Sequence, residues 1–288
     1  MSAFLPSPMM VHRLRSVDEF VAFRRREASA LAAHQAEIEA LVPRRERAFK
    51  VDGFSYTAGR VVSFEVDFKY SWAAGVVNWR ERVCCPVTGF NNRMRGTIHL
   101  FDLEMDTYPD AQIYVTEQVS SFYRYMTARF PHAVGSEYIG DRVPLGTADA
   151  RGIRNEDLTR LTFSEDCFDA VVSLDVFEHI PDFLAAFRQC ARVLRPGGRM
   201  FWSVPFIASN HANLIRAVVR DGCVEHLQPP EYHADPLSSD GVLCYQHFGW
   251  EMLEQVKRCG FRDAYALCYF SRAFGYLGGE QFLFVARK

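Results

Sequence analysis

The sequence has neither an excess of one charge nor a long hydrophobic run. Its 288 residues carry 33 basic and 35 acidic side chains, a formal net charge of -2. Because this balance gives no broad basic surface, nucleic acid is not an expected partner. No apolar run approaches the length of a bilayer span, and residues 1–8 do not resemble a signal peptide. We therefore predict a cytoplasmic protein without a membrane or nucleic-acid partner.

The eight cysteines are too scattered to indicate a disulfide framework, and we expect reduced, mostly buried thiols. Residues 85–89, C-P-V-T-G, resemble half of a zinc ribbon in which Thr88 replaces the second cysteine. Residues 53–59 are a candidate for the other half, but they contain no cysteine. A structural zinc ion needs four Cys or His ligands. We predict a degenerate zinc-ribbon-like module, and no metal site in the chain.

Hydrophobic periodicity divides the chain into three regions. Residues 1–48 are predicted to be helical, with Ser16 and Glu19 as a capping box. Residues 49–108 contain short strand patterns. From 109 to 288, strands and helices alternate, which is typical of a doubly wound α/β fold. Strands are expected at 113–116, 133–139, near Ile153, and at 168–174, 200–206, 263–270 and 280–286, with helices at 119–130, 183–194 and 250–259.

These elements predict a Rossmann-like, mostly parallel sheet of seven strands with an antiparallel C-terminal hairpin, beside the small N-terminal helical and β module. Residues 207–245 are read as an insertion that follows the fifth strand and lies over the strand ends. In such a sheet a ligand binds outside the carboxyl ends of the strands. The residues that end each strand should therefore determine the chemistry of the site.

Acidic residues stand at four of these strand ends. The first strand ends in Thr116, Glu117 and Gln118, and the second ends at Glu137. Glu156 and Asp157 follow the third strand, and Asp175 ends the fourth. Carboxylates accept hydrogen bonds from ribose hydroxyls and from an exocyclic amine, and they favour a cationic centre. The alternative is that each acid caps the next helix.

The residues around the third and fourth strands resemble a known family. Residues 156–169, 175–180 (D-V-F-E-H-I) and 192–198 (R-V-L-R-P-G-G) are similar to the pattern of class I S-adenosylmethionine-dependent methyltransferases, of the type 11 kind. The resemblance covers about residues 109–288 and implies S-adenosylmethionine as the cofactor. It also implies cofactor-binding residues at the ends of the second to fourth strands. These are Glu137, Tyr138, Glu156, Asp157, Leu158, Ser173, Leu174 and Asp175.

The first loop departs from the family pattern. That loop is normally rich in glycine, since side chains would block the approach of the backbone to the cofactor. Residues 116–120, T-E-Q-V-S, contain no glycine. Either the loop takes another course, with Thr116, Glu117 and Gln118 at the cofactor, or binding is weakened. We favour the first interpretation because the other strand ends match.

Two histidines are candidate catalytic bases, because histidine titrates near neutral pH. His179 follows the fourth strand, and His233 lies in a proline-framed stretch of the insertion. The alternatives are a capping role for His179 and a plain surface position for His233. His247, beside 248–250, is expected to pack against or cap the next helix.

The sequence thus predicts an enzyme that methylates a small molecule, at an oxygen of a sugar, a glycan intermediate or a secondary metabolite. The alternative is an inactive methyltransferase-like binding protein with an altered first loop. A dinucleotide enzyme is disfavoured because no G-x-G-x-x-G follows a strand. A homodimer is plausible from the 14% aromatic content.

Overall fold

The computed structural model describes residues 9–105 and 109–288. The chain divides into two compact units, each built from separate stretches of sequence. Unit 1 comprises Met1–Leu14, Val21–Thr107 and Ala266–Leu283, and unit 2 comprises Arg15–Phe20, Tyr108–Tyr265 and Phe284–Lys288. The predicted domain boundaries at residues 48 and 108 stay a prediction. In the described part of the chain, no helix combines the length and apolar character that crossing a membrane requires.

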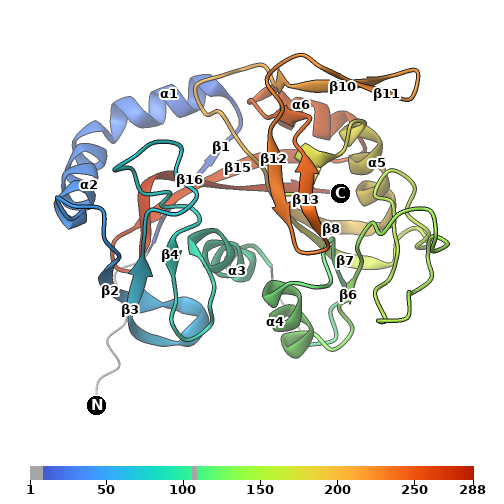
Figure 1. The fold of residues 1–288 in the computed structure, drawn as a ribbon, viewed down its shortest axis with the longest axis horizontal. Helices are drawn as coiled ribbons and strands as arrows, with labels where there is room; N and C mark the ends of the chain where they lie inside the picture. Colours follow the sequence, from blue (N-terminus) through green and yellow to red (C-terminus); the bar gives the residue numbers. More distant parts are fainter. Residues whose placement is uncertain (1–8, 106–108) are drawn as a thin grey trace. The chain divides into compact units, whose positions relative to one another are not determined.

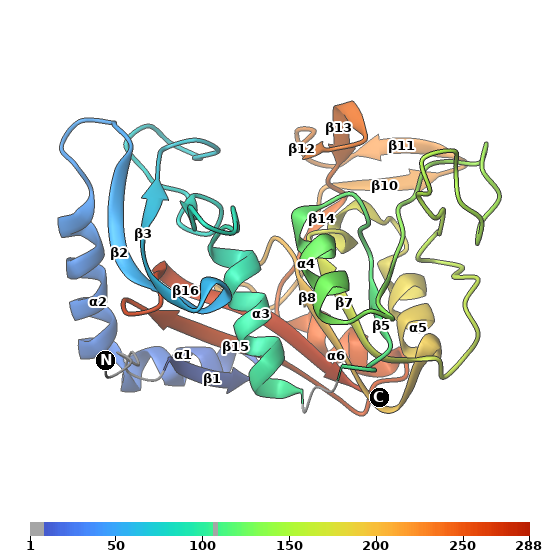
Figure 2. The same cartoon turned by 90° about the horizontal axis from the view of Figure 1, so that it is seen from below.

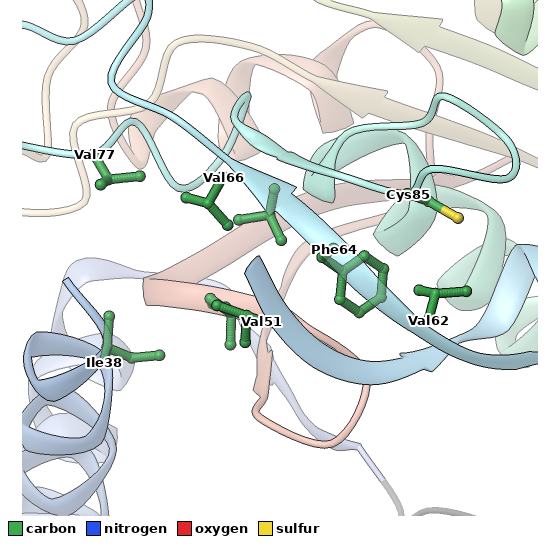
Figure 3. Packing of buried hydrophobic residues seen from close by; sticks show 9 residues of the cluster. Ile38, Val51, Val62, Phe64, Val66, Val77 and Cys85 are labelled. Atoms are coloured by element: carbon green, nitrogen blue, oxygen red, sulfur yellow. The ribbon is translucent and has the colours of Figure 1, made fainter. Parts of the chain in front are cut away.

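Unit 1 contains a three-stranded antiparallel sheet and most of the N-terminal helices (Figure 1). The sheet has the order β2-β3-β4, and its side chains join Ile38 and Leu277 in one apolar cluster (Figure 3). The capping box forms in part, since the Ser16 hydroxyl accepts from the Glu19 amide at 3.1 Å. The elements of this region are β1 (Met10–Leu14), α1 (Val17–Arg26), α2 (Ala28–Leu41), β2 (Phe49–Ser55), η1 (Tyr56–Ala58), β3 (Arg60–Val66), β4 (Val83–Cys84) and α3 (Asn92–Glu104).

The two predicted half-ribbons meet in this sheet. The Ser55 hydroxyl donates to the Cys85 sulfur at 3.3 Å, and Ser55 and Thr57 share a hydrogen bond. Burial raises the pKa of Cys85, but hydrogen bonds from Ser55 and Thr88 outweigh it and the net pKa is lowered. Hydroxyls therefore surround the thiol here. The zinc-ribbon resemblance itself stays a prediction.

Unit 2 is built on parallel strands with helices beside them (Figure 2). Strands β8, β7, β5 and β6 pair in parallel, and the end of β16 pairs antiparallel with β8. Its elements are β5 (Ile113–Val115), α4 (Ser121–Arg129), β6 (Val134–Gly135), β7 (Phe168–Leu174), η2 (Phe177–His179), α5 (Phe183–Val193), β8 (Leu194–Ser203), β9 (Leu214–Ile215), β10 (Ala217–Arg220), β11 (Cys223–His226), β12 (Tyr232–Asp235), β13 (Ser238–Leu243), β14 (Gln246–His247) and α6 (Glu251–Arg258), with β15 (Asp263–Ser271) and β16 (Tyr276–Arg287) running through both units.

The full sheet has the order β1-β15-β16-β8-β7-β5-β6. This confirms the predicted Rossmann-like sheet of seven strands, mixed in direction. The apolar run of β7 is buried almost throughout, as a strand covered on both faces should be. Phe187 of α5 packs on Trp202 of β8, with ring centroids 5.3 Å apart.

One predicted strand was wrong, and another was missed. Near Ile153 the structure has only isolated bridges, from Asn155 to Glu137 and from Arg154 to Ala148. The side-chain amide of Asn155 donates to the carbonyls of Gly140 and Val143, so loop contacts replace a ladder there. The seventh strand is β1, which lies in the region predicted to be helical and pairs antiparallel with β15.

One strand boundary also differs from expectation. Strand β8 begins at Leu194, six residues before the predicted start, because residues 195–198 already belong to it. The insertion at 207–245 has strands of its own. It folds into short antiparallel pairs, β10 with β11 and β12 with β13 (Figure 1).

Candidate active site

The ends of β5 and β7 are tied together by side chains. Thr116, directly after β5, is buried, and its hydroxyl donates to the hydroxyl of Ser173 at 2.8 Å. Ser173, in β7, has no exposed surface. The polar atoms of these two predicted cofactor residues thus face each other, and they hold the two strand ends in register.

The glycine-free loop is closed by the acid at the end of β6. One oxygen of Glu137 accepts from the amides of Gln118 and Val119, at 2.6 and 2.9 Å. The side chain of Gln118 donates to the Gly152 carbonyl and accepts from the Arg154 amide. The loop therefore takes a course of its own, and the polar atoms of Gln118 are used inside the protein.

The glycine that this course requires lies on β6 instead of in the loop. A Cβ on Gly135 would stand 2.7 Å from the carbonyl oxygen of Glu117 and 2.5 Å from the Tyr123 ring. Both distances are shorter than real Cβ contacts, so only glycine lets the loop lie this close to β6. Gly135 thus allows close packing of β6 against the first loop.

Glu137 is half-buried and has one oxygen left for a ligand. Its Oε1 accepts both loop amides, whereas its Oε2 has no hydrogen bond within residues 9–105 and 109–288. Burial raises the pKa of Glu137, the two amides oppose that shift, and the nearby Asp235 adds to it. Tyr138 beside it is 59% exposed. Asp235 belongs to β12, so the predicted insertion does reach the end of β6.

Glu156 and Asp157, predicted to follow the third strand, both bond to neighbouring residues of the protein. Glu156 is buried; it pairs with Arg154 at 2.7 Å and accepts from the Thr162 amide and hydroxyl. Asp157 accepts from Thr159 and pairs with the Arg160 guanidinium at 2.9 Å. Leu158, which follows Asp157, is buried. These contacts shape the 156–162 loop, and the predicted cofactor contacts of its residues stay predictions.

Strand β7 ends in an uncommon backbone conformation. Asp175, after the buried Leu174, has a φ of 54°, in the left-handed region that aspartate tolerates better than most residues. Its amide donates to the Ser203 carbonyl, and its carboxylate accepts from the Ser203 hydroxyl at 2.8 Å. The turn is therefore fixed by the end of β8 and leads directly into η2.

Six side chains gather after this turn, and we call them the Glu178 cluster. The cluster brings together the two predicted catalytic histidines, His179 from η2 and His233 from β12, with ring centroids 4.9 Å apart. The remaining members come from η2, from the start of β12 and from the segment that follows β13. The cluster comprises Glu178, His179, Glu231, His233, Cys244 and His247.

Hydrogen bonds attach the segment after β13 to η2 and to the residue that follows it. The Tyr245 amide donates to the Glu178 carbonyl at 2.7 Å, and the side chain of Gln246 donates to the carbonyls of Phe177 and Ile180. Gly241 has a φ of 73°, and a Cβ there would lie 2.5 Å from the carbonyl oxygen of His233. The position of His233 therefore depends on a glycine eight residues along the chain.

Glu178 is the residue that sequence reasoning missed. Its side chain has no exposed surface, and neither carboxylate oxygen has a hydrogen-bond partner in the described part of the chain. The nearest imidazole nitrogens are His233 Nδ1 at 3.6 Å and His179 Nε2 at 3.8 Å. Burial raises its pKa. The signal was an acid directly before a predicted catalytic histidine, after a buried strand.

The rest of the cluster is closely connected. Glu231 Oε1 accepts from His233 Nε2 at 3.0 Å and from His247 Nε2 at 2.9 Å. Contacts with Cys244, Glu178 and Glu231 raise the pKa of His233 to about 11. His247 does not cap α6, because its Nε2 contacts Glu231 and the start of that helix has no side-chain cap; that His247 packs against the helix stays a prediction.

Comparison with known proteins shows that part of this chain is similar to methyltransferases. Residues 120–202 match the family model described as "Methyltransferase domain". A 27-O-demethylrifamycin SV methyltransferase of Amycolatopsis mediterranei is 34% identical over 124 residues, 39% of this chain and 43% of that protein. A ubiquinone biosynthesis O-methyltransferase of Marinobacter nauticus is 31% identical over 119 residues, 38% of this chain and 48% of that protein. The matched part thus spans less than half the length of either relative.

Among solved structures, an S-adenosylmethionine-dependent methyltransferase of Mesorhizobium loti aligns over 66% of this chain and 96% of that chain, with 17% identity and a TM-score of 0.40. Residues 120–202 therefore resemble a methyltransferase domain, and the observed strand order is that of a Rossmann-like mixed sheet. The predicted site residues lie at or after the carboxyl ends of β5, β6 and β7 and on β12.

Proposed function

We propose that the chain is an S-adenosylmethionine-dependent methyltransferase that methylates an oxygen atom of a small molecule. The observation that carries the proposal is the free oxygen of Glu137 at the end of β6, in the same strand-end region as the histidine pair after β7. A hydrogen-bond acceptor for the cofactor and a base for the acceptor are thus both present.

The residues fit the chemistry of this cofactor. Glu137 Oε2 can accept from ribose hydroxyls, because the backbone amides hold only Oε1. Asp175 supplies negative charge at the end of β7, which suits a sulfonium cation. Leu158 is buried beside Asp157 and can offer apolar surface to the adenine ring. When bound, the cofactor supplies an electrophilic methyl group.

The protein's own residues then orient the acceptor and hold its proton. His179 Nδ1 donates to the Leu243 carbonyl at 2.9 Å, which fixes the ring and leaves Nε2 without a proton in the neutral form. Nε2 is therefore able to accept the proton of an acceptor hydroxyl. The hairpin of β12 and β13 places His233 beside this position, with its ring centroid 4.9 Å from that of His179.

The names of the relatives support oxygen as the methylated atom. Both curated relatives are named for O-methylation, one of a rifamycin and the other in ubiquinone biosynthesis. An aromatic or other hydroxyl compound of secondary metabolism, as the methyl acceptor, fits these names and the His-rich site. A sugar or a glycan intermediate is the second class of acceptor that we propose. The cytoplasmic location and the homodimer stay predictions.

One observation favours the alternative, an inactive binding protein. The amides of Gln118 and Val119 already bond to Glu137, so they are not available to a cofactor without rearrangement. In this reading the loop has closed over the cofactor position and the fold is kept for recognition alone. The two proposals differ in whether the protein binds S-adenosylmethionine.

Isothermal titration calorimetry with S-adenosylmethionine separates the proposals. We expect the wild type to bind and Glu137→Ala to lose about 10- to 100-fold in affinity, the effect of about 1.5–3 kcal/mol for hydrogen bonds to a charged group. Glu165→Gln is the matched control, since Glu165 is an exposed acid of unit 2. If the folded wild type shows no binding, the enzyme proposal is wrong and the binding-protein reading replaces it.

A further inference from the structure

The carboxylate of Glu178 is a buried charge that is not stabilised by hydrogen bonds from the described part of the chain. Its side chain has no exposed surface and neither oxygen has a hydrogen-bond partner in the described part of the chain. Burying an unpaired carboxylate is costly, so such groups are paired or bind metal ions. The carboxylate faces two imidazole nitrogens, both just beyond hydrogen-bond distance.

Three ligand atoms surround one common position. The carboxylate of Glu178, His179 Nε2 and His233 Nδ1 all lie within 4.8 Å of one another. Zinc binds imidazole nitrogen and carboxylate oxygen at about 2.0–2.2 Å, so two ligands at the tetrahedral angle stand about 3.4 Å apart. The observed separations of 3.6 and 3.8 Å are close to that value. A small inward movement of the side chains would be enough to coordinate an ion.

Both histidines are also held as metal ligands usually are. A ligating histidine donates its other ring N–H to a carbonyl or carboxylate, which sets the tautomer and the ring orientation. His179 donates through Nδ1 to the Leu243 carbonyl at 2.9 Å, and His233 donates through Nε2 to Glu231 at 3.0 Å. Glu231 is in turn held by His247 and by Arg216 at 3.1 Å.

We propose that Glu178, His179 and His233 bind a divalent transition-metal ion such as Zn²⁺, with at least one coordination position open. Two histidines and one carboxylate form a ligand set typical of catalytic zinc and of non-haem iron sites. The sequence predicted no metal site, since these ligands are 55 positions apart in the chain and meet only through the hairpin.

A second group in the cluster is a weaker candidate. Glu231, His233 and Cys244 also have ligand atoms within 4.8 Å of one another. In that group, however, Glu231 already accepts from two imidazoles and pairs with Arg216, and His233 would have to give up its contact with Glu231. The unpartnered Glu178 is what distinguishes the proposed site.

The open position narrows the class of acceptor, a step that rests on the proposed function. A bound divalent cation attracts oxygen donors and lowers the pKa of a hydroxyl that coordinates to it. The acceptor would then be a hydroxyl compound, such as a phenol or a vicinal diol, whose oxygen coordinates the ion and becomes the nucleophile. In the metal-bound protein the ion would replace His179 in promoting loss of the hydroxyl proton, which would pass to solvent water. The oxygen would then form its bond to the methyl group as the sulfur–methyl bond of the donor breaks and S-adenosylhomocysteine leaves.

Metal binding can be measured without donor or acceptor, so its failure is distinct from failure of the proposed function. The full chain, stripped with a chelator, is titrated with Zn²⁺ against a chromophoric competitor, and the metal content after dialysis is measured by mass spectrometry. We expect one equivalent per chain. Glu178→Gln, His179→Gln and His233→Gln should each lower the affinity at least 10-fold, while the exposed His226→Gln should leave it unchanged.

Cobalt substitution identifies the ligands. Co²⁺ bound by nitrogen and oxygen gives visible d–d bands without a thiolate charge-transfer band, and Cys244→Ser should then change neither spectrum nor stoichiometry. The proposal is overturned if the wild type takes up less than one equivalent or if Glu178→Gln keeps its metal. It is also overturned if Cys244→Ser alone abolishes binding, which would assign the second group. Circular dichroism of each stripped variant confirms that it is folded.

Discussion

Arg95 in unit 1 and Glu178 in unit 2 are both completely buried charged side chains, and their surroundings differ in kind. In unit 1, Arg95 of α3 donates to the carbonyls of Val83, Phe274 and Gly275. Its guanidinium also lies 4.0 Å from the centroid of the Phe64 ring. In unit 2, Glu178 has no hydrogen-bond partner for either oxygen in the described part of the chain.

The difference separates a structural charge from a functional one. Arg95 links the segment after β15 to β4 within unit 1, because its planar fork donates to carbonyls of both segments. Glu178 faces only the imidazoles of His233 and His179, at 3.6 and 3.8 Å, and accepts no hydrogen bond from a residue of the described part of the chain, so its acceptor capacity is kept for a group that arrives from outside. An unsatisfied buried charge marks a place where stability has been given up for binding.

The largest expected effect comes from removing the structural charge. Arg95→Met leaves buried carbonyls without donors, and we expect a loss of about 3 kcal/mol or more in the free energy of unfolding. Urea denaturation measures it, with the exposed Arg45→Met as the control, expected within about 0.5 kcal/mol of wild type. If Arg95→Met is as stable as the control, the structural role assigned to Arg95 is wrong.

A second titratable group of unit 1 should make its stability depend on pH. Burial lowers the pKa of His99, which stacks on Tyr56, to about 4. The folded pKa lies below the unfolded value of 6.5, so the unfolded state binds the proton first as pH falls. Stability is therefore complete above about pH 6.5 and decreases towards pH 4, by about 2 kcal/mol between pH 7 and pH 5.

Urea denaturation at pH 7 and pH 5 tests this dependence. His99→Phe keeps an aromatic ring in place and removes the titration, so its difference between the two pH values should shrink by about 2 kcal/mol relative to wild type. The exposed His226→Gln should retain the wild-type difference. An unchanged pH dependence in His99→Phe would show that other groups account for it.

A smaller effect is expected in the hairpin that carries His233. Gly241→Ala combines a positive φ with a clash against the His233 carbonyl, and should cost about 1–2 kcal/mol and weaken Zn²⁺ binding. Gly222→Ala is the matched control, since Gly222 has a φ of 77° and nothing within 4 Å of the added Cβ. Equal metal affinity in the two variants would show that Gly241 does not position His233.

The smallest expected effect is on the stability of the stripped protein when the functional charge is neutralised. Glu178→Gln removes the burial cost of a carboxylate together with its ion pairs to His179 and His233, so the free energy of unfolding should stay within about 1 kcal/mol of wild type. This change is much smaller than the loss expected for Arg95→Met. A loss above about 2 kcal/mol would mean that Glu178 is a structural charge like Arg95.

The parts of the fold that could be predicted are those with strong local signals. The apolar run 168–174 was predicted with the bounds that β7 has, and the periodic helix beginning at Phe183 ends at Val193, one residue before its predicted end. Strand β1 was missed because five residues with one buried position carry no strand pattern of their own. It is a strand only because β15 offers an edge.

The candidate site was predictable only in its outline. The acids and the two histidines could be found because strand ends converge in this fold. Their partners could not. The sequence does not indicate that Glu137 accepts hydrogen bonds from the first loop or that Glu156 forms an ion pair with Arg154. Nor does it indicate that Glu178 faces two imidazoles. Those are contacts between residues far apart in the chain.

What the sequence by itself determined was the alternation of strand and helix, the burial of the central strands and the kinds of side chain at the strand ends, because these follow from periodicity and composition along the chain. The tertiary structure decided which of those side chains are satisfied. Hydrogen bonding is directional and short in range, so only the packed position of the hairpin leaves the Glu178 carboxylate unpartnered beside two oriented histidines.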